Sequence, residues 1–330
     1  MKMKPTFIHI GLHKTGSTFL QDKIFPRFSN TTFISRPFTC NNHAFNKLKE
    51  ADDILYNKEE ILQIIENINS DEDTSKILLS DESFSGRALD FQYVNRSLIA
   101  YRLRELFPDA TIIIFLRSQK NIIKSLYNQW VKGYTKGYKS IENFISVPGD
   151  DYTYSRYMKD KQNGNYKTAK TWYFNPYNNL SLECFYYYGL INFYKKLFPK
   201  VHVFLYEELR DNPLKVLENL EIIFNEKGLN LEDLDLSSKV NASLDDSTLE
   251  RQILKNRVNV LTNNKLLYRL FRIRFLIKKY SKYQTKENQS SIEDYLERIA
   301  ESYYKKDNQE IITKYPDIGI QNYSKEYGIE

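Results

Sequence analysis

The residues best suited to chemistry in this sequence form one run, Gly11-Leu-His-Lys-Thr-Gly-Ser-Thr18. The run follows the β-branched segment 6–10 and precedes apolar residues at helical spacing, so it is predicted to join a strand to a helix. Such a turn directs backbone N–H groups and the positive end of a helix dipole at one point. Hydroxyl side chains add donors, and Lys14 adds a positive charge. The run is therefore predicted to bind a phosphate-like anion.

The position of the lysine separates this run from the loop of ordinary ATP- and GTP-hydrolysing proteins. That loop reads G-x-x-x-x-G-K-[ST], with the lysine directly after the second glycine. Gly11 and Gly16 have the required spacing, but Ser17 stands where the lysine belongs, and Lys14 lies three residues earlier. A charge at the crown of the loop meets a different ligand oxygen than a charge at the helix start. Ordinary magnesium-dependent chemistry is therefore disfavoured, and an atypical kinase that uses ATP is kept as an alternative.

Strand and helix patterns alternate along the chain and define the elements that position this run. The predicted strands are 6–10, 76–80, 111–116 and 201–206, and the predicted helices are 16–28, 57–68, 95–107, 118–131, 181–198 and 213–227. Alternation of this kind predicts a parallel sheet with crossover helices on both faces. We therefore expect a three-layer α/β fold in a single domain, residues 1–330, that carries helical and aromatic insertions.

Composition excludes several classes of protein. Of 330 residues, 41% are hydrophobic and 27% are charged, which allows a sizeable core and argues against wholesale disorder. No uncharged apolar run approaches the roughly 18 residues that span a bilayer, and the first residues lack the pattern of a signal peptide. Two cysteines and four histidines argue against a disulfide scaffold or a zinc site. The expectation is a cytoplasmic protein without a metal, or one that is peripheral at a membrane.

The run IHIGLHKTGSTFLQ resembles the phosphosulfate-binding loop of sulfotransferases that use PAPS, 3′-phosphoadenosine 5′-phosphosulfate. It is most similar to the bacterial and carbohydrate-type members, whose loop carries HKTG. The resemblance implies a P-loop-like fold and sulfuryl transfer without a metal, in which Lys14 stabilises the leaving 5′-phosphate. The donor contacts that it implies come from Lys14, Thr15, Gly16, Ser17 and Thr18.

A second sequence element also resembles this family. The family binds the 3′-phosphate of the nucleotide with an arginine at a strand end and a serine eight residues later on the next helix. Arg117 ends the apolar strand 111–116, and Ser125 follows eight residues on. The stretch Phe204-Leu-Tyr-Glu-Glu-Leu-Arg-Asp-Asn-Pro213 is similar to a family stretch that is mainly structural. The matched motifs extend from residue 6 to about residue 213.

The acceptor hydroxyl of such a reaction needs a general base. In the family, this base lies at the end of the third strand, where the present chain has Ser80-Asp81-Glu82-Ser83. Glu82 is the predicted base. Asp81 and His13, the latter within the loop, are the alternatives.

The segment 133–180 has no clear period and is rich in aromatic residues, so we interpret it as an insertion on the acceptor side. Flat amphipathic rings with neighbouring donors suit the faces of sugars. The predicted acceptor is therefore a carbohydrate or glycan, with contacts from Tyr134, Trp172 and Tyr173.

The basic character of the chain is concentrated in one amphipathic segment. Residues 251–286 contain eleven Lys or Arg and no Asp or Glu, whereas the rest of the chain has 37 basic and 42 acidic residues. The segment suits an anionic polysaccharide, an anionic membrane surface or a cover over the nucleotide, and a packed helix with a solvated basic face explains it equally. A non-catalytic protein that binds anionic glycans or membranes is thus a third hypothesis. No recognisable nucleic-acid-binding module accompanies the segment, so no nucleic acid is expected.

Overall fold

The computed structural model describes residues 3–38, 40–86, 93, 95–133, 141–146, 180–229, 248–249, 251–253, 255–256 and 287–330. The chain forms two compact units, and each is described by itself. The first unit comprises Met1–Ser118, Tyr187–Val240 and Asp307–Ser324, and the second comprises Gln119–Tyr186, Asn241–Lys306 and Lys325–Glu330. The organisation of residues 1–330 as a single domain stays a prediction.

The first unit is built on a parallel sheet. Its strands are β1 (Thr6–His9), β2 (Thr31–Ser35), β3 (Lys76–Ser80), β4 (Thr111–Leu116) and β7 (Lys200–Leu205). They lie in the order β2-β3-β1-β4-β7, and every neighbouring pair is parallel. The predicted α/β architecture is thereby confirmed, and β1 occupies the centre of the sheet.

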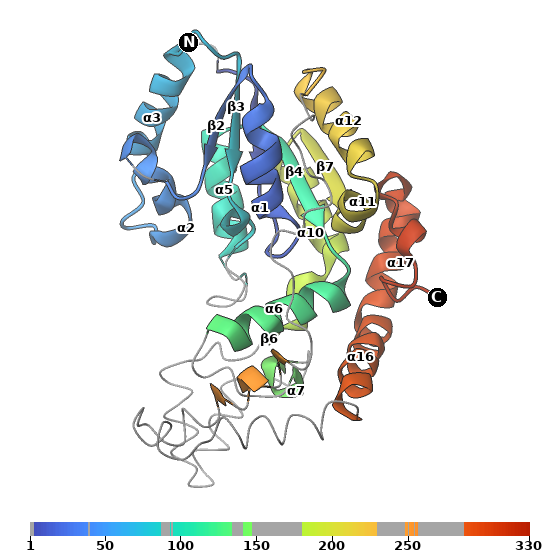
Figure 1. The fold of residues 1–330 in the computed structure, drawn as a ribbon. Coiled ribbons are helices and arrows are strands. Elements are labelled where there is room, and N and C mark those ends of the chain that lie inside the picture. The colour runs from blue at the N-terminus through green and yellow to red at the C-terminus, as the bar shows by residue number, and fades with distance from the viewer. Residues whose placement is uncertain are drawn as a thin grey trace, which may run out of the picture. The chain divides into compact units, whose positions relative to one another are not determined.

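Helices cover both faces of this sheet (Figure 1). The helices of the first unit are α1 (Ser17–Phe19), α2 (Lys47–Glu50), α3 (Lys58–Ser70), α5 (Arg96–Leu106), α10 (Tyr187–Leu197), α11 (Tyr206–Asp211) and α12 (Pro213–Phe224). Helices α1 and α12 lie on one face, and α5 and α10 lie on the other (Figure 1). The predicted three layers are therefore present in this unit.

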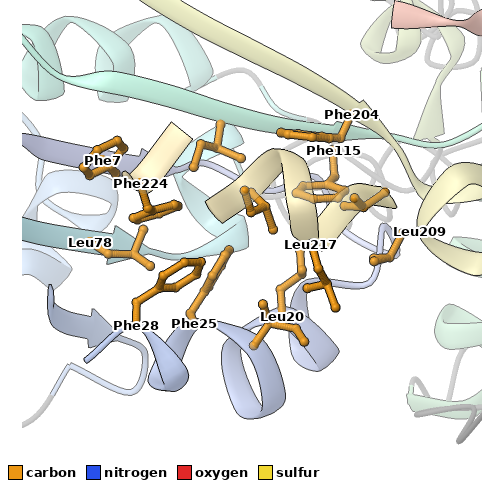
Figure 2. Close-up of a cluster of buried hydrophobic side chains, with 14 residues drawn as sticks. Phe7, Leu20, Phe25, Phe28, Leu78, Phe115, Phe204, Leu209, Leu217 and Phe224 are labelled. Carbon is orange, nitrogen blue, oxygen red and sulfur yellow. The ribbon is translucent and has the colours of Figure 1, made fainter. Parts of the chain in front are cut away.

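The core between the sheet and helices α1 and α12 combines six phenylalanines with aliphatic side chains (Figure 2). Side chains alternate between the faces of a strand, so Phe7 of β1 and Phe115 of β4 point to this side. Phe224 of α12 stacks on Phe7 and on Phe28, with ring centroids 4.3 Å apart in both pairs. Stacking of this kind adds free energy beyond the burial of area, and it ties the end of α12 to β1.

Three details differ from the sequence-based expectation. The segment 16–28 is helical, but α1 has only three residues and continues as a π-helical turn (Leu20–Ile24) and a 3-10 turn (Phe25–Arg27) that contains Pro26. Proline lacks a backbone N–H and cannot continue a regular α-helix. The predicted helix 181–198 is a 3-10 turn (Leu182–Phe185) followed by α10, and strand β2 was not predicted.

The break before α10 has an identifiable cause. The carboxylate of Asp307 accepts hydrogen bonds from the backbone N–H groups of Tyr187 and Tyr188, at 2.8 and 3.2 Å. These N–H groups belong to the first turn of α10, where no carbonyl within the helix can bind them. A residue 120 positions away in the chain therefore caps this helix, which a local sequence pattern could not indicate.

The second unit is mostly helical in its described part. Its elements are α6 (Gln119–Gly133), α7 (Ile141–Phe144), β5 (Ile145–Ser146), β6 (Leu180–Ser181), α16 (Glu287–Ile299) and a π-helical turn (Ala300–Tyr304). Strands β5 and β6 pair in parallel. Lys124 and Lys120 of α6 form ion pairs with Glu293 and Glu297 of α16.

The remaining elements complete the described chain. They are the 3-10 turns Cys40–Asn46, Glu82–Ser85, Pro316–Ile318 and Ile320–Tyr323, and helix α17 (Lys305–Lys314).

Within the ranges that the structure describes, no helix combines the length and the apolar character that crossing a membrane requires.

A buried polar network lies in the sheet of the first unit. His9 and Ser80 are fully buried, and the His9 Nδ1 atom lies 2.7 Å from the Ser80 Oγ atom. The Gln21 amide donates to the same Oγ at 3.0 Å. The His9 ring packs edge-on against Phe25 and Phe115, and its buried Nε2 atom has no hydrogen-bond partner in the described part of the chain. Burial lowers the pKa of His9 from 6.5 to about 3, and the nearby Asp81 charge only partly opposes this effect.

We expect this histidine to make the protein acid-sensitive. Because the pKa is lower in the folded state, the unfolded chain takes up the proton first, so the stabilisation is complete above pH 6.5 and is lost as the pH falls from 6.5 towards 3. The slope from this one group approaches about 1.4 kcal/mol per pH unit. Urea unfolding between pH 5 and 7.5 should show a shallower slope for His9→Gln than for the unchanged protein. His43→Gln serves as the control, because it removes an exposed histidine that lies outside this buried network. Equal slopes for all three proteins would contradict the prediction.

Candidate functional site

All five strands of the sheet run in the same direction, so the residues that follow them gather at one edge. In parallel α/β sheets, ligands bind beyond the carboxyl ends of the strands, where the strand order reverses. Here the order reverses at β1, which lies between β3 and β4. The residues that follow the strands are the loop Gly11–Thr18 after β1, Arg36 after β2, Asp81 and Glu82 after β3, Arg117 after β4 and Tyr206 after β7.

The loop after β1 has an unusual backbone. Gly11, Lys14 and Gly16 have φ angles of 60°, 68° and 86°, all in the left-handed region. Lysine adopts this conformation at a cost, because its Cβ atom approaches the backbone, whereas glycine does so freely. Alternation of right- and left-handed residues turns successive N–H groups towards a common concavity, which suits an anion. The loop therefore has the backbone of an anion-binding turn, with Lys14 at its crown.

Some hydroxyl groups of the loop form hydrogen bonds within the loop itself. The Thr15 side chain is fully buried and donates from Oγ1 to the Leu12 carbonyl oxygen at 2.7 Å. The Ser17 hydroxyl, also buried, lies 3.4 Å from the same oxygen. Thr18 lies in α1 and is half-buried. Thr15 thus holds the loop in shape, and contacts from Thr15, Ser17 and Thr18 to a ligand stay predictions.

Arg117 reaches the loop. Its Nη1 atom donates to the Lys14 carbonyl oxygen at 2.9 Å, and its guanidinium lies over the Tyr206 ring, 4.5 Å from the centroid. The Arg117 Nε atom is buried, and no described group accepts a hydrogen bond from it. Two of the predicted donor-binding residues, Lys14 and Arg117, are thus in direct contact.

Glu82 lies directly against the loop. A Cβ atom added to Gly11 would be 2.7 Å from the Cα atom of Glu82, so the two backbones approach as closely as glycine permits. The Glu82 carboxylate forms an ion pair with Arg36 at 2.5 Å. The Arg36 side chain is 41% exposed and that of Glu82 is 15% exposed, so this pair stands at the boundary with solvent. The predicted base is therefore beside the predicted anion site, with a cation bound to it.

Asp81, the alternative base, forms buried interactions within the fold. Its carboxylate is fully buried, forms an ion pair with Lys49 through Oδ2, and accepts the Ser83 backbone N–H through Oδ1 at 2.8 Å. A buried carboxylate with two such partners is costly to separate from them. This arrangement favours Glu82 over Asp81 as the group that exchanges a proton.

His13, the third candidate base, lies in the loop beside Tyr93. The Tyr93 hydroxyl is 3.5 Å from His13 Nδ1, and the two rings pack edge to face. Burial lowers the pKa of His13. The carboxylates of Glu82 and Asp81 act in the opposite direction, and the charges of Arg36 and Lys14 lower it further. Burial thus favours the neutral form of His13, which lies within electrostatic range of both Glu82 and Lys14.

The other predicted site residues are placed less fully. Ser125 lies in α6 of the second unit, whereas Arg117 belongs to the first, so their shared contact with a 3′-phosphate stays a prediction. The acceptor residues Tyr134, Trp172 and Tyr173 lie outside the described residues, as does most of the basic segment 251–286. Among the described residues, no group of three or more His, Cys, Asp or Glu is arranged to hold a metal ion.

The structure adds residues that the sequence did not indicate. Arg36 escaped notice because strand β2, which it follows, was not predicted, although Thr31-Thr32-Phe33-Ile34 is a β-branched and aromatic run. Lys49 meets Asp81 only through tertiary structure. Tyr206 belongs to a stretch that resembled a structural motif, and it is the residue on which the Arg117 guanidinium lies.

Comparison with known proteins gives a distant structural likeness. No protein-family model matches the chain, and no curated protein matches its sequence. Among solved structures, the chain is similar to a sulfotransferase from Alicyclobacillus acidocaldarius, with 14% sequence identity and a TM-score of 0.40. The match covers 79% of this chain and 97% of that chain. The functional argument below rests on the site rather than on this likeness.

The close approach of Gly11 to Glu82 leads to a stability prediction. In Gly11→Ala, the new methyl group meets backbone at a left-handed φ, so we expect a loss of roughly 1–3 kcal/mol. Gly189 is a matched control, because it lies in α10 and a Cβ atom there meets nothing within 4 Å. Gly189→Ala should be neutral or raise stability by up to about 1 kcal/mol. Urea unfolding measures both, and equal stability of the two variants would refute the close approach.

Proposed function

We propose that this chain is a sulfotransferase that moves a sulfuryl group from PAPS to a hydroxyl group of a carbohydrate or glycan. The observation that carries the proposal is the hydrogen bond from Arg117 Nη1 to the Lys14 carbonyl oxygen. It joins the two sequence elements on which the family resemblance rests, although 103 positions separate them. A phosphate-binding loop in contact with an arginine suits a donor that carries anionic groups at two places.

Two further features of the described residues fit such a donor. The buried Arg117 Nε atom lacks a hydrogen-bond partner in the described chain, and a buried donor gains free energy when an anionic oxygen satisfies it. The left-handed residues at positions 11, 14 and 16 give the loop the backbone of an anion cradle. PAPS would therefore be held by the loop at its phosphosulfate end and by Arg117 at its 3′-phosphate.

The proposal assigns a role to individual residues of the site. When bound, PAPS supplies an activated sulfuryl group next to a 5′-phosphate that can leave. Lys14 and the N–H groups of the loop stabilise negative charge there, as preorganised donors do in related transfers. Glu82 accepts the proton of the acceptor hydroxyl. Because Arg36 holds the Glu82 carboxylate, this ion pair opens before Glu82 takes up the proton.

The acceptor class rests on the sequence alone. Tyr134, Trp172 and Tyr173 supply the aromatic surfaces that sugars bind, and segment 251–286 supplies charge for an anionic polysaccharide or membrane surface. No observation on the described residues favours a kinase, whose magnesium-dependent loop requires lysine at the position of Ser17.

Nucleotide binding provides the first test of the proposal. We expect 3′-phosphoadenosine 5′-phosphate to raise the melting temperature by a few degrees, because a ligand at 100 times its Kd adds about 2.7 kcal/mol to stability. AMP, which lacks the 3′-phosphate, should bind more weakly. Arg117→Ala should lose the advantage of the bisphosphate over AMP, whereas Arg27→Ala, which removes an arginine from the chain segment that leads into β2, should keep it. A shift with ATP and magnesium alone would favour the kinase, and no shift with any nucleotide would end the proposal.

Glu82→Gln tests the general base. The amide keeps the size of the side chain but cannot take up the proton, so sulfuryl transfer should fall by about 100- to 10,000-fold while nucleotide binding is retained. The readout is release of 3′-phosphoadenosine 5′-phosphate from PAPS with a glycan that the unchanged protein sulfates. Glu105→Gln is the control, since Glu105 is also ion-paired, to Lys58, but at an exposed position. Near-normal turnover of Glu82→Gln would move the role of base to His13.

A further inference from the structure

The backbone at the end of β4 is held from two sides. The Tyr187 hydroxyl donates to the Arg117 carbonyl oxygen at 2.7 Å, and the Glu207 carboxylate accepts the Ser118 N–H at 3.0 Å. Tyr187, Ser118 and Glu207 are all fully buried. The two partners come from different elements, the first residue of α10 and the second residue of α11. The peptide group between Arg117 and Ser118 is therefore fixed at both its carbonyl and its N–H.

The side chain of Arg117 is held by the same elements. Its guanidinium lies over the ring of Tyr206, the residue before Glu207, and its Nη1 atom donates to the Lys14 carbonyl oxygen. A cation over an aromatic face is attracted to it, and the ring also sets the plane of the guanidinium. Because the Arg117 backbone and the plane of its guanidinium are both fixed, the side chain extends towards the loop.

Helix α11 also sets the position of the loop itself. A Cβ atom at Gly16 would lie 3.1 Å from Leu209 Cδ2 and 3.4 Å from Tyr206 Cδ2. The start of helix α1 therefore lies against α11, and the ring of Tyr206 faces the space beside Gly16 as well as the Arg117 guanidinium. One short helix thus sets the distance between the loop and the arginine.

We propose that Tyr187, Glu207 and Tyr206 are positioning residues of the nucleotide site, which act through Arg117 to set its geometry relative to the loop. The inference rests on the proposed function, because it assigns a role in recognition of the 3′-phosphate. It deepens that function by giving the Tyr206-Glu207 pair a task at the site. None of the three residues needs to touch the nucleotide for this task.

Not every buried tyrosine hydroxyl has such a role, and helix α10 contains a second buried tyrosine that serves as a control. Tyr194 also lies in α10 and is fully buried, yet its hydroxyl has no hydrogen-bond partner in the described part of the chain. Tyr187→Phe and Tyr194→Phe therefore remove the same atom from the same helix at the same burial. Only the first removal frees the Arg117 carbonyl oxygen.

The test is the affinity for 3′-phosphoadenosine 5′-phosphate and for AMP, measured by calorimetry on the full chain. Tyr187→Phe should weaken binding of the bisphosphate by about tenfold, the equivalent of one lost hydrogen bond, and leave AMP binding unchanged. Tyr194→Phe should change neither affinity. In an Arg117→Ala background, Tyr187→Phe should have no further effect, because the residue through which it acts is gone.

A second pair of variants guards against misfolding. Glu207→Gln retains an oxygen that can accept the Ser118 N–H and should keep most of the selectivity for the bisphosphate, whereas Glu207→Leu should lose it. Thermal unfolding without ligand verifies that each variant is folded. One outcome would overturn the positioning role and leave the proposed function standing. In that outcome, the unchanged protein prefers the bisphosphate to AMP, and the folded variants Tyr187→Phe and Glu207→Leu show the same preference. If the unchanged protein does not bind the bisphosphate, the proposed function fails, and this inference fails with it.

Discussion

The hydrogen bond from Arg117 to the Lys14 carbonyl oxygen is the interaction on which the geometry of the candidate site depends. Lys14 has a left-handed backbone, which costs a non-glycine residue roughly 1–2 kcal/mol. A hydrogen bond from a charged donor contributes about 1.5–3 kcal/mol, so this bond offsets the strain at the crown of the loop. The strained conformation persists because the surrounding structure holds it, and Arg117 is the part of that structure that comes from a distant strand.

Three carboxylates at the edge of the sheet have described partners. Asp81 is paired with Lys49 in the interior, Glu82 is paired with Arg36 at the solvent boundary, and the Glu207 carboxylate accepts a backbone N–H. Asp81 and Glu82 are thus each paired with a cation. The two ion pairs differ in exposure, since the Arg36 side chain is 41% exposed and that of Lys49 is 8% exposed.

The sequence was sufficient to predict most of the strands and helices, but it was insufficient to predict contacts between distant residues. Strands β1, β3, β4 and β7 were predicted because apolar, β-branched runs alternate with helical periods. Strand β2 was missed, and with it Arg36, because this edge strand is only partly buried and mixes hydroxyl with apolar side chains. The loop and Arg117 were found through their spacing, but their contact, and the parts played by Tyr187 and Glu207, depend on side chains that only the fold brings together.

The first unit is assembled from three stretches of chain, and β1 is both its earliest strand and its central one. During synthesis, β1 leaves the ribosome long before its neighbours β3 and β4 exist to pair with it. The stretch Asp307–Ser324, which supplies the cap of α10, is the last of the three to emerge. Pairing over such long separations is slow and leaves apolar strand edges exposed while it proceeds. The first unit therefore stays incompletely folded until its third stretch has been made, although its central strand is the first to be synthesised.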